Sequence, residues 1–362
     1  MTNINVKFMT FNIRVDKGEK QPFQAPPASF SSNEKLIGEQ PWSIRKWKIA
    51  DTILFYQPDI IGFQELYYHQ IIDLHSLLGE EYDWIGVGRV DGKQDGEHCA
   101  IFYKKNEFSV NEWKTIWLSE TPEKVGSQGW NAKHPRVATI ATFIQNNNNR
   151  QFYVFNTHYD HISTAARVNS SHLLLEEARK LKDAPVILLG DFNTVESDEA
   201  YHVLTNNFET LNNNTWQQIE ALNNEVASQF SKTTGIPVRT TENSITLPTH
   251  RIFRRGQFNL GISSNKDNDT ENNKEIYFKD TRYQLKTRLN NHGQLSGPYG
   301  HEFTFTSFGE ESQKEFANRR IDYIFYLSSS DVHVSNYAVL ENQYDDGLII
   351  SDHRPIIVQL SW

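Results

Sequence analysis

Short polar and acidic motifs recur along this chain, each directly after an apolar run that has the length of a buried strand. They cover residues 9–12, 61–65, 156–158, 190–194 and 351–355. A carboxylate at the end of a buried strand is costly unless a positive group compensates its charge, and a hard divalent cation is such a group. The pattern therefore predicts a layered, strand-rich protein that carries a metal-assisted hydrolytic site at its strand ends.

Apolar periodicity predicts many strands and only a few helices between them. The expected strands cover residues 5–12, 60–63, 84–90, 99–103, 113–118, 137–143, 152–157, 185–189, 303–307, 321–325, 332–340 and 356–360. We expect helices over 67–78 and 165–181, and another that has Ser43 as its N-cap and ends before Pro58. Two stacked, mixed sheets with helices on both outer faces fit this order better than one doubly wound sheet.

Two stretches depart from this regular pattern. Residues 16–41 are rich in Pro, Ser, Lys and Glu and are expected to form a long loop. Residues from about 206 to 300 are rich in Asn, Thr, Ser and Gln, and a helix is expected there over 216–228. We interpret the 362 residues as a single α/β domain, 1–362, with an Asn-rich insertion at about 206–300.

The amino-acid composition and net charge limit the cellular compartments and binding partners that we expect. The chain contains no apolar run of about 18 residues that could span a membrane. Its single cysteine, Cys99, suits a reducing compartment, and the N-terminus has no signal-peptide pattern, so we expect a cytoplasmic protein, with a nuclear location left open. A formal net charge of −9 argues against tight, non-specific binding to long DNA, because phosphate affinity comes mainly from Lys and Arg.

Asp191 and Asn193 follow the most apolar of the expected strands. Side chains two residues apart in an extended segment point the same way, so this carboxylate and this carboxamide would face one point. Asp191 could hold or deprotonate a water molecule, and Asn193 could fix that water or a phosphate oxygen. An ordinary Asx turn explains the pair about equally well when it is taken alone.

The other motifs carry single residues with a plausible chemistry. Glu65 suits a hard cation such as Mg²⁺. Taken alone, it is better explained as an acidic residue at the N-terminus of the next helix, where the helix dipole favours negative charge. Asp352 offers a further metal ligand beside His353, which could stabilise charge on a phosphate when protonated. Asp322 could orient His353. A surface turn is the alternative for the Asp352–His353 pair.

His158 ends the expected strand 152–157 and begins a run of titratable side chains, with Asp160 and His161 close behind. This run is a candidate acid–base cluster. Glu97 lies just before the expected strand 99–103 and could pair with a histidine, whose pKa the nearby negative charge would then raise.

Each of these motifs is weak alone, but their order is specific. The succession Asn12, Glu65, His158, Asp191-x-Asn193, Asp322 and Asp352-His353 resembles that of the endonuclease/exonuclease/phosphatase superfamily. The resemblance covers about 1–205 and 300–362. It implies a four-layer sandwich, in which two mixed β-sheets pack face to face with helices on both outer faces and the site lies at one edge of the sheets.

The resemblance also implies which residues would bind a metal ion and which would hold the attacking water molecule. Glu65 would be the principal ligand of Mg²⁺ or Mn²⁺, helped by Asn12 and Asp352. Asp191 would position or deprotonate the attacking water, with Asn193 beside it.

A second group would act on the phosphate. His353, oriented by Asp322, would contact the scissile phosphate, and His158, paired with Glu97, would take a second histidine role. Arg136 matches a position at which the family often places an arginine on the phosphate, although a surface charge explains it equally well.

These roles together predict a Mg²⁺- or Mn²⁺-dependent phosphoesterase that hydrolyses a phosphate mono- or diester by in-line attack of an activated water. A nuclease acting on DNA or RNA is the alternative. A non-catalytic binding module of the same fold would require the loss of core positions, and none is lost. The net charge and the lack of basic tracts favour a small molecule or a short nucleic acid as substrate, and no protein partner is implied.

Overall fold

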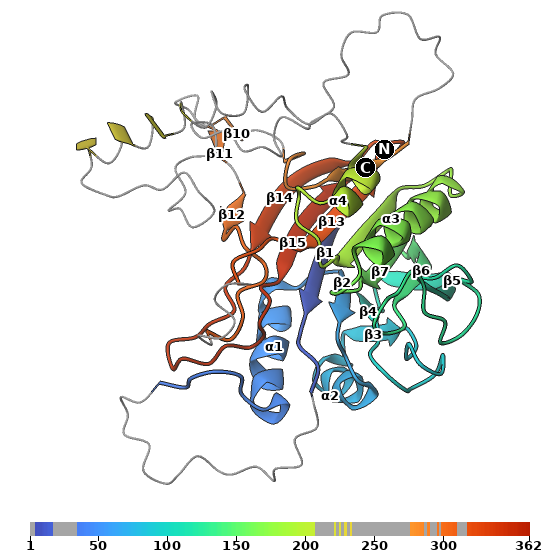
Figure 1. Cartoon of the computed structure of the whole chain (residues 1–362), viewed down its shortest axis with the longest axis horizontal. Helices are drawn as coiled ribbons and strands as arrows, with labels where there is room; N and C mark the ends of the chain where they lie inside the picture. Colours follow the sequence, from blue (N-terminus) through green and yellow to red (C-terminus); the bar gives the residue numbers. More distant parts are fainter. Residues whose placement is uncertain are drawn as a thin grey trace, which may run out of the picture.

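Two β-sheets form the centre of this protein, and helices lie outside them (Figure 1). The computed structural model describes residues 4–16, 35–206, 276–285, 298–309 and 317–362, together with a few positions between 221 and 296. Among the described helices, none has both the length and the apolar character that crossing a membrane requires.

The first sheet has seven strands. In spatial order they are β12 (Tyr299–Gly300), β14 (His333–Val339), β15 (Ile356–Ser361), β1 (Asn5–Asn12), β2 (Ile60–Gln64), β4 (Ile101–Lys104) and β3 (Tyr82–Ile85). β1 runs parallel to β2 and antiparallel to β15, so the sheet is mixed.

The second sheet has six strands. In spatial order they are β5 (Phe108–Trp117), β6 (Val137–Gln145), β7 (Arg150–His158), β8 (Val186–Asp191), β13 (Asp322–Leu327) and β9 (Phe278–Asp280). Here β7 and β8 are parallel, whereas β8 and β13 are antiparallel. A separate short pair joins β10 (Arg288–Leu289) to β11 (Leu295–Ser296).

The buried apolar side chains fall into layers that define how the sheets and helices stack. One cluster fills the space between the sheets and includes Phe8 of β1 and Phe152 of β7. A second joins the outer face of the first sheet, for example Met9, to helices α1 (Trp42–Tyr56) and α2 (Tyr68–Leu78). A third joins the second sheet to α3 (Thr164–Arg179) and α4 (Glu199–Thr205). Because Phe8 and Met9 are consecutive in a strand, they point to opposite faces. The predicted two-sheet sandwich with outer helices is confirmed.

Some predicted boundaries were wrong. Helix α1 begins one residue before Ser43, and its N-cap is Pro41, whose carbonyl oxygen accepts the N–H groups of Ile44 and Arg45. Ser43 therefore lies inside the first turn. The strand predicted over 84–90 ends at Ile85, because the chain turns at Gly86, whose φ of 139° a side chain would not tolerate.

The strand predicted over 303–307 was also wrong. In this segment Phe305 makes isolated bridges to Arg319 and His353, and the chain then turns at Ser307, which has a φ of 59°. Alternating aromatic and threonine side chains indicate a strand. Here, however, the only residue of this segment with bridges to other described residues is Phe305, which makes one isolated bridge to each of two different segments.

Parts of the segment that we assigned to an insertion belong to the sheets. β9 pairs with β13 in the second sheet, and β12 pairs with β14 in the first. The helix predicted over 216–228 and most of the loop predicted over 16–41 lie outside the described residues.

A polar bridge joins the two sheets where β2 crosses β7. The side-chain amide nitrogen of Asn156 donates hydrogen bonds to the carbonyl oxygens of Phe63 and Ala100, both at 2.9 Å. Its amide oxygen accepts a hydrogen bond from Gln64 Nε2 at 2.7 Å. Asn156 and Gln64 are fully buried, so each of these bonds also removes the penalty of an unpaired polar group.

Gly62 makes this close approach of the sheets feasible. A Cβ atom added to Gly62 would collide with Leu189 Cδ1 and would lie 2.8 Å from Asn156 Cγ. We therefore predict that Gly62→Ala lowers the free energy of unfolding by about 1–3 kcal/mol, the usual effect of overpacking a core. Chemical denaturation followed by circular dichroism would measure it.

The matched control is truncation of the colliding side chain. Leu189→Ala alone should destabilise by about 2–5 kcal/mol because it leaves a cavity. The double variant should be more stable than the sum of the two effects predicts, since the alanine methyl group occupies part of that cavity. Strict additivity would contradict the proposed collision.

Candidate active site

The registers of both sheets bring the polar motifs to one place. In the parallel pair β1–β2, Asn12 stands opposite the last residue of β2, so Glu65 follows beside it. In the parallel pair β7–β8, His158 stands opposite Asp191, and the antiparallel strand β13 places Asp322 on the other side of Asp191. Residues that are far apart in sequence therefore meet at a single edge of the sandwich.

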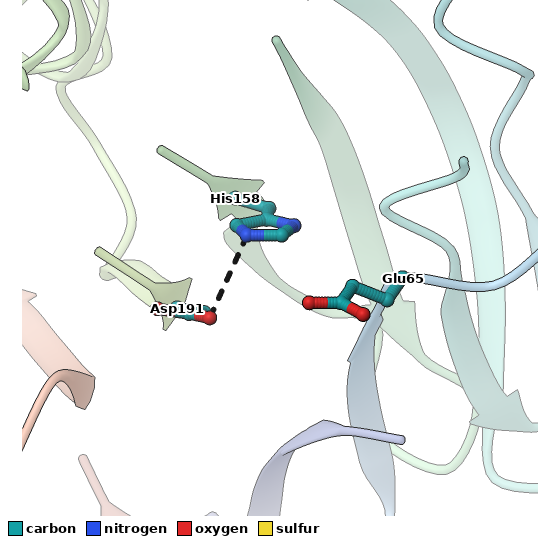
Figure 2. Close-up of side chains that lie close together, drawn as sticks. All are labelled: Glu65, His158 and Asp191. Carbon is teal, nitrogen blue, oxygen red and sulfur yellow. Dashed lines mark ion pairs between the residues drawn. The ribbon is translucent and has the colours of Figure 1, made fainter. Parts of the chain in front are cut away.

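Figure 2 shows the centre of this cluster, in which Glu65 extends from the end of β2 toward His158 and Asp191 at the ends of β7 and β8. One ligand atom from each of these side chains lies within 4.8 Å of the others. His158 Nε2 is 3.6 Å from Asp191 Oδ2. Asp191, Asp322 and His353 form a second such group.

Asn12 connects the carboxylates of the two sheets. Its Nδ2 donates hydrogen bonds to Glu65 Oε1 at 3.0 Å and to Asp191 Oδ2 at 2.9 Å. Its Oδ1 accepts a hydrogen bond from the backbone N–H of Arg14 at 3.0 Å. In this arrangement Asn12 acts by orienting Glu65 and Asp191, and its amide oxygen is engaged by the backbone.

Glu65 is held in its ionised form. Burial opposes ionisation, but Arg14, the backbone N–H of Val15 at 3.0 Å and Asn12 together hold the pKa of Glu65 below its ordinary value. Its backbone has a φ of 65°, a strained conformation for a residue with a side chain. Strain of this kind persists only where surrounding contacts enforce it.

Asp352 lies across Arg14 from Glu65. Arg14 NH1 is 3.6 Å from Asp352 Oδ2 and 3.8 Å from Glu65 Oε2. Burial and the charge of Glu65 raise the pKa of Asp352. Asn12 and Glu65, two of the three expected metal ligands, are thus joined by a hydrogen bond. The third, Asp352, is connected to Glu65 through the charge of Arg14.

The pKa of Asp191 is raised to the neutral range. Burial and the nearby charge of Asp322 raise its pKa to about 7. Its Oδ1 accepts a hydrogen bond from the backbone N–H of Asn193 at 2.9 Å.

The expectation that the Asn193 side chain faces the same point as Asp191 was wrong. Asn193 has a φ of 46°, so the segment is not extended and side chains two residues apart no longer align. The Asn193 side-chain amide instead donates a hydrogen bond to the carbonyl oxygen of Tyr159 at 3.0 Å. Asn193 contacts Asp191 only through its own backbone N–H.

His353 and Asp322 are paired as the sequence predicted. His353 Nδ1 is 2.8 Å from Asp322 Oδ2, and His353 Nε2 is 3.7 Å from Asp191 Oδ2. Burial lowers the pKa of His353, but the charges of Asp322 and Asp191 outweigh it and raise the pKa to about 10. His353 is therefore a buried cation at neutral pH.

His158 has the opposite electrostatic environment. Its Nδ1 is 3.7 Å from Glu97 Oε2, so the expected neighbour is present. Burial, together with the charges of Arg136 and Arg89, nevertheless holds the pKa of His158 well below its ordinary value. The prediction that Glu97 raises this pKa was wrong, because Arg89 NH1 lies 2.8 Å from Glu97 Oε2 and neutralises it.

Arg136 is buried beside His158 and does not lie on the surface. Its side chain is 5% exposed, NH2 is 3.1 Å from His161 Nδ1, and NH1 is 3.8 Å from Glu97 Oε2. Burial and Arg136 also lower the pKa of His161. The two histidines next to Arg136 are therefore neutral at neutral pH.

Two arginines that shape the cluster, Arg14 and Arg45, were not among the residues predicted from the sequence. Arg14 joins Glu65 to Asp352, as described above. Arg45 of α1 is buried, and its NH1 donates hydrogen bonds to the carbonyl oxygens of Ile13 at 2.7 Å and Ile350 at 2.8 Å. It thereby holds the segments that lead to Arg14 and to Asp352. A buried arginine on a helix has no sequence signal that separates it from a surface one.

The donor set fits a hard divalent cation. Carboxylate oxygens are the ligands that Mg²⁺ prefers, and Glu65 is kept ionised. Among the described residues, the buried Oδ1 of Asp322 has no hydrogen-bond partner, so this region holds negative charge that is not fully compensated. Glu65, His158 and Asp191, whose ligand atoms lie within 4.8 Å of one another, form one group that could hold such an ion, and Asp352 lies across Arg14 from Glu65.

The chain belongs to the Endonuclease/Exonuclease/phosphatase family, whose sequence model matches residues 9–353. Members of this family are hydrolases that act on phosphate esters. Nocturnin from Mus musculus is 28% identical over 172 residues, which are 44% of this chain and 38% of that protein. The chain spans 66% of the length of the first curated relative it matches and 38% of the next.

Two solved structures share the fold of the described residues. An endonuclease/exonuclease/phosphatase from Bacteroides vulgatus is 25% identical, with a TM-score of 0.67, and 99% of this chain aligns with 98% of that one. A mannosyl-6-phosphatase from Bacteroides thetaiotaomicron is also 25% identical, with a TM-score of 0.63, and 99% of this chain aligns with all of that one.

The pairing of His353 with Asp322 leads to a testable shift. In metal-free protein, Asp322→Asn should lower the pKa of His353 from about 10, because it removes one of the two negative charges that stabilise the imidazolium. Histidine NMR titration would measure it. Asp331→Asn, an exposed change between β13 and β14, is the control. An unchanged His353 pKa in Asp322→Asn would contradict the assigned pairing.

Proposed function

We propose that this protein is a divalent-metal-dependent phosphoesterase that hydrolyses a phosphate ester of a small molecule by in-line attack of an activated water. The observation that carries the proposal is the meeting of Glu65, His158, Asp191 and a protonated His353 in one buried cluster. An ionised carboxylate, a carboxyl group that titrates near neutrality and a fixed cation are the groups that phosphate hydrolysis requires.

In this proposal Glu65 and Asp352 hold Mg²⁺ or Mn²⁺, and Asn12 orients Glu65 for that purpose. When bound, the ion supplies positive charge against the charge that develops on the phosphoryl oxygens. Arg45 binds the carbonyl oxygens of Ile13 and Ile350, so that the backbone leading to Arg14 and to Asp352 keeps its position when the site fills.

Asp191 positions the attacking water and accepts its proton. A pKa of about 7 suits a base at neutral pH, because such a group is ionised in a large fraction of molecules and still binds a proton well. The backbone N–H of Asn193 and the side chain of Asn12 each hold one oxygen of this carboxylate, which fixes its orientation.

His353 contacts the phosphate as a cation, since its pKa of about 10 keeps it protonated at neutral pH. Asp322 holds Nδ1, which leaves Nε2 directed toward Asp191 and the reacting group. Preorganised positive charge of this kind stabilises the transition state without reorganisation. His158, kept neutral beside Glu97, contributes a hydrogen bond on the other side of Asp191, and Arg136 adds positive potential there.

One of the comparisons supports a small substrate. The mannosyl-6-phosphatase relative aligns over its full length and acts, by its name, on a sugar phosphate. A net charge of −9 also disfavours long nucleic acids. We therefore propose sugar phosphates as the first substrates to test, with nuclease activity as the alternative outcome. The cytoplasmic location and the single domain over 1–362 stay predictions from the sequence.

A metal-dependence assay tests the reaction class. We expect phosphate release from at least one member of a panel of sugar phosphates, phosphodiesters and short single- and double-stranded nucleic acids. Chelation by EDTA should abolish it, because the metal supplies much of the charge stabilisation, and added Mg²⁺ or Mn²⁺ should restore it. Turnover that survives chelation would contradict the proposal. Hydrolysis of nucleic acids alone, falling steeply with added salt, would favour the nuclease.

Substitutions in the cluster test the assigned roles. Glu65→Ala, Asp191→Ala and His353→Ala should each lower turnover by at least about 100-fold, the usual loss when a positioned acid, base or charge is removed. Initial rates on the substrate identified above would measure this, with circular dichroism to confirm folding. His172→Ala, an exposed histidine on α3, should leave the rate unchanged. Rates near wild type in any two cluster variants would contradict the assignment.

A further inference from the structure

Arg14 lies where a cation between Glu65 and Asp352 would lie. Its NH1 is 3.8 Å from Glu65 Oε2 and 3.6 Å from Asp352 Oδ2, and its Nε is 3.4 Å from Glu39 Oε1. The distances to Glu65 and Asp352 are longer than a good hydrogen bond, so charge attraction is the main tie between NH1 and these carboxylates. The side chain is 21% exposed, so its guanidinium can be reached from solvent.

The backbone of Arg14 is fixed even though its guanidinium is loosely held. Arg14 has a φ of 63°, which is strained for a residue with a Cβ atom. Its N–H is bonded to Asn12 Oδ1, and its carbonyl oxygen accepts hydrogen bonds from Gln70 Nε2 at 3.1 Å and Arg45 NH2 at 3.3 Å. A strained residue held on both sides of its peptide has a defined side-chain direction, here toward the two carboxylates.

An arginine and a divalent cation cannot both compensate these carboxylates fully. Each cation lowers the negative potential that attracts the other, and the two repel at short distance. A guanidinium also binds phosphate well, because its planar fork matches two phosphate oxygens. A phosphate ester that enters the cluster therefore offers Arg14 a second anionic partner in addition to the carboxylates.

We propose that Arg14 competes with the divalent metal ion for Glu65 and Asp352, and that a bound phosphate relieves this competition by drawing the guanidinium onto itself. This inference rests on the proposed function, since it takes Glu65 and Asp352 as the metal ligands. Two consequences follow. Removing the Arg14 charge strengthens metal binding in the absence of phosphate. Metal and phosphate each strengthen the binding of the other by the same factor, and part of that factor depends on Arg14.

Mn²⁺ binding tests both consequences without any turnover. Electron paramagnetic resonance, which measures free Mn²⁺, gives the dissociation constant for each protein with and without inorganic phosphate. Arg14→Gln should bind Mn²⁺ about tenfold more tightly than wild type without phosphate, which corresponds to about 1.4 kcal/mol. Phosphate should then improve Mn²⁺ binding less in Arg14→Gln than in wild type.

Two further variants isolate the cause. Arg14→Lys keeps the charge but loses the fork, so its Mn²⁺ affinity alone should stay near wild type while the improvement by phosphate falls. This variant still tests the inference if Arg14→Gln does not fold. Arg354→Gln removes an arginine of similar exposure, 18%, that lies 3.6 Å from Glu341, and it should change neither quantity.

The outcomes separate the two proposals. Weaker or unchanged Mn²⁺ binding in a folded Arg14→Gln protein would overturn the competition, while the metal site itself would stand. An equal effect of phosphate in wild type, Arg14→Gln and Arg14→Lys would overturn the transfer of Arg14 to phosphate. If wild-type protein takes up no Mn²⁺, the proposed function fails, and this inference fails with it.

Discussion

The site depends on the polar bridge that Asn156 makes between the two sheets. Over most of their contact the sheets are held by apolar side chains, which fix a separation but no register. At Asn156 a fully satisfied carboxamide binds the backbone of the opposite sheet, and Gly62 lets the strands approach there. Directional hydrogen bonds in a buried setting specify one alignment. In that alignment Asn12 and Asp191, which come from different sheets, lie 2.9 Å apart and form a hydrogen bond.

Once the strand ends meet, their charges determine one another. Burial and the charge of Asp322 raise the pKa of Asp191 to about 7. The carboxylates of Asp322 and Asp191 in turn keep His353 protonated. His158, only 3.6 Å from Asp191, is neutral because burial and then the charges of Arg136 and Arg89 hold its pKa well below the ordinary value. The pKa values of these neighbouring groups therefore differ widely, so the groups have different protonation states before any substrate binds. This is the physical content of the proposed acid–base roles.

The sequence predicted what depends on local pattern and missed what depends on backbone conformation. Apolar runs followed by polar motifs located Asn12, Glu65, His158 and Asp191 at strand ends, because strand period and burial are local. The orientation of the Asn193 side chain could not be predicted, since it follows from a positive φ, which asparagine tolerates but does not always adopt. The charge state of His158 also required contacts between distant segments. The family and the two-sheet fold were confirmed, whereas the roles of the site residues stay proposals.

Backbone strain at the site is held in place by hydrogen bonds from the residues around it. Arg14, Glu65 and Asn193 all have positive φ values, and each follows a strand end within two residues. Strained residues cost of order 1–3 kcal/mol each and relax unless their neighbours hold them. Here the neighbours are Arg45, which binds the carbonyl oxygens of Ile13 and Arg14, and Asn12, which binds the N–H of Arg14 and the carboxylate of Glu65. Loss of these hydrogen bonds would let the backbone relax and the carboxylates move apart. The strained backbone and the close placement of the buried charges therefore depend on the same contacts.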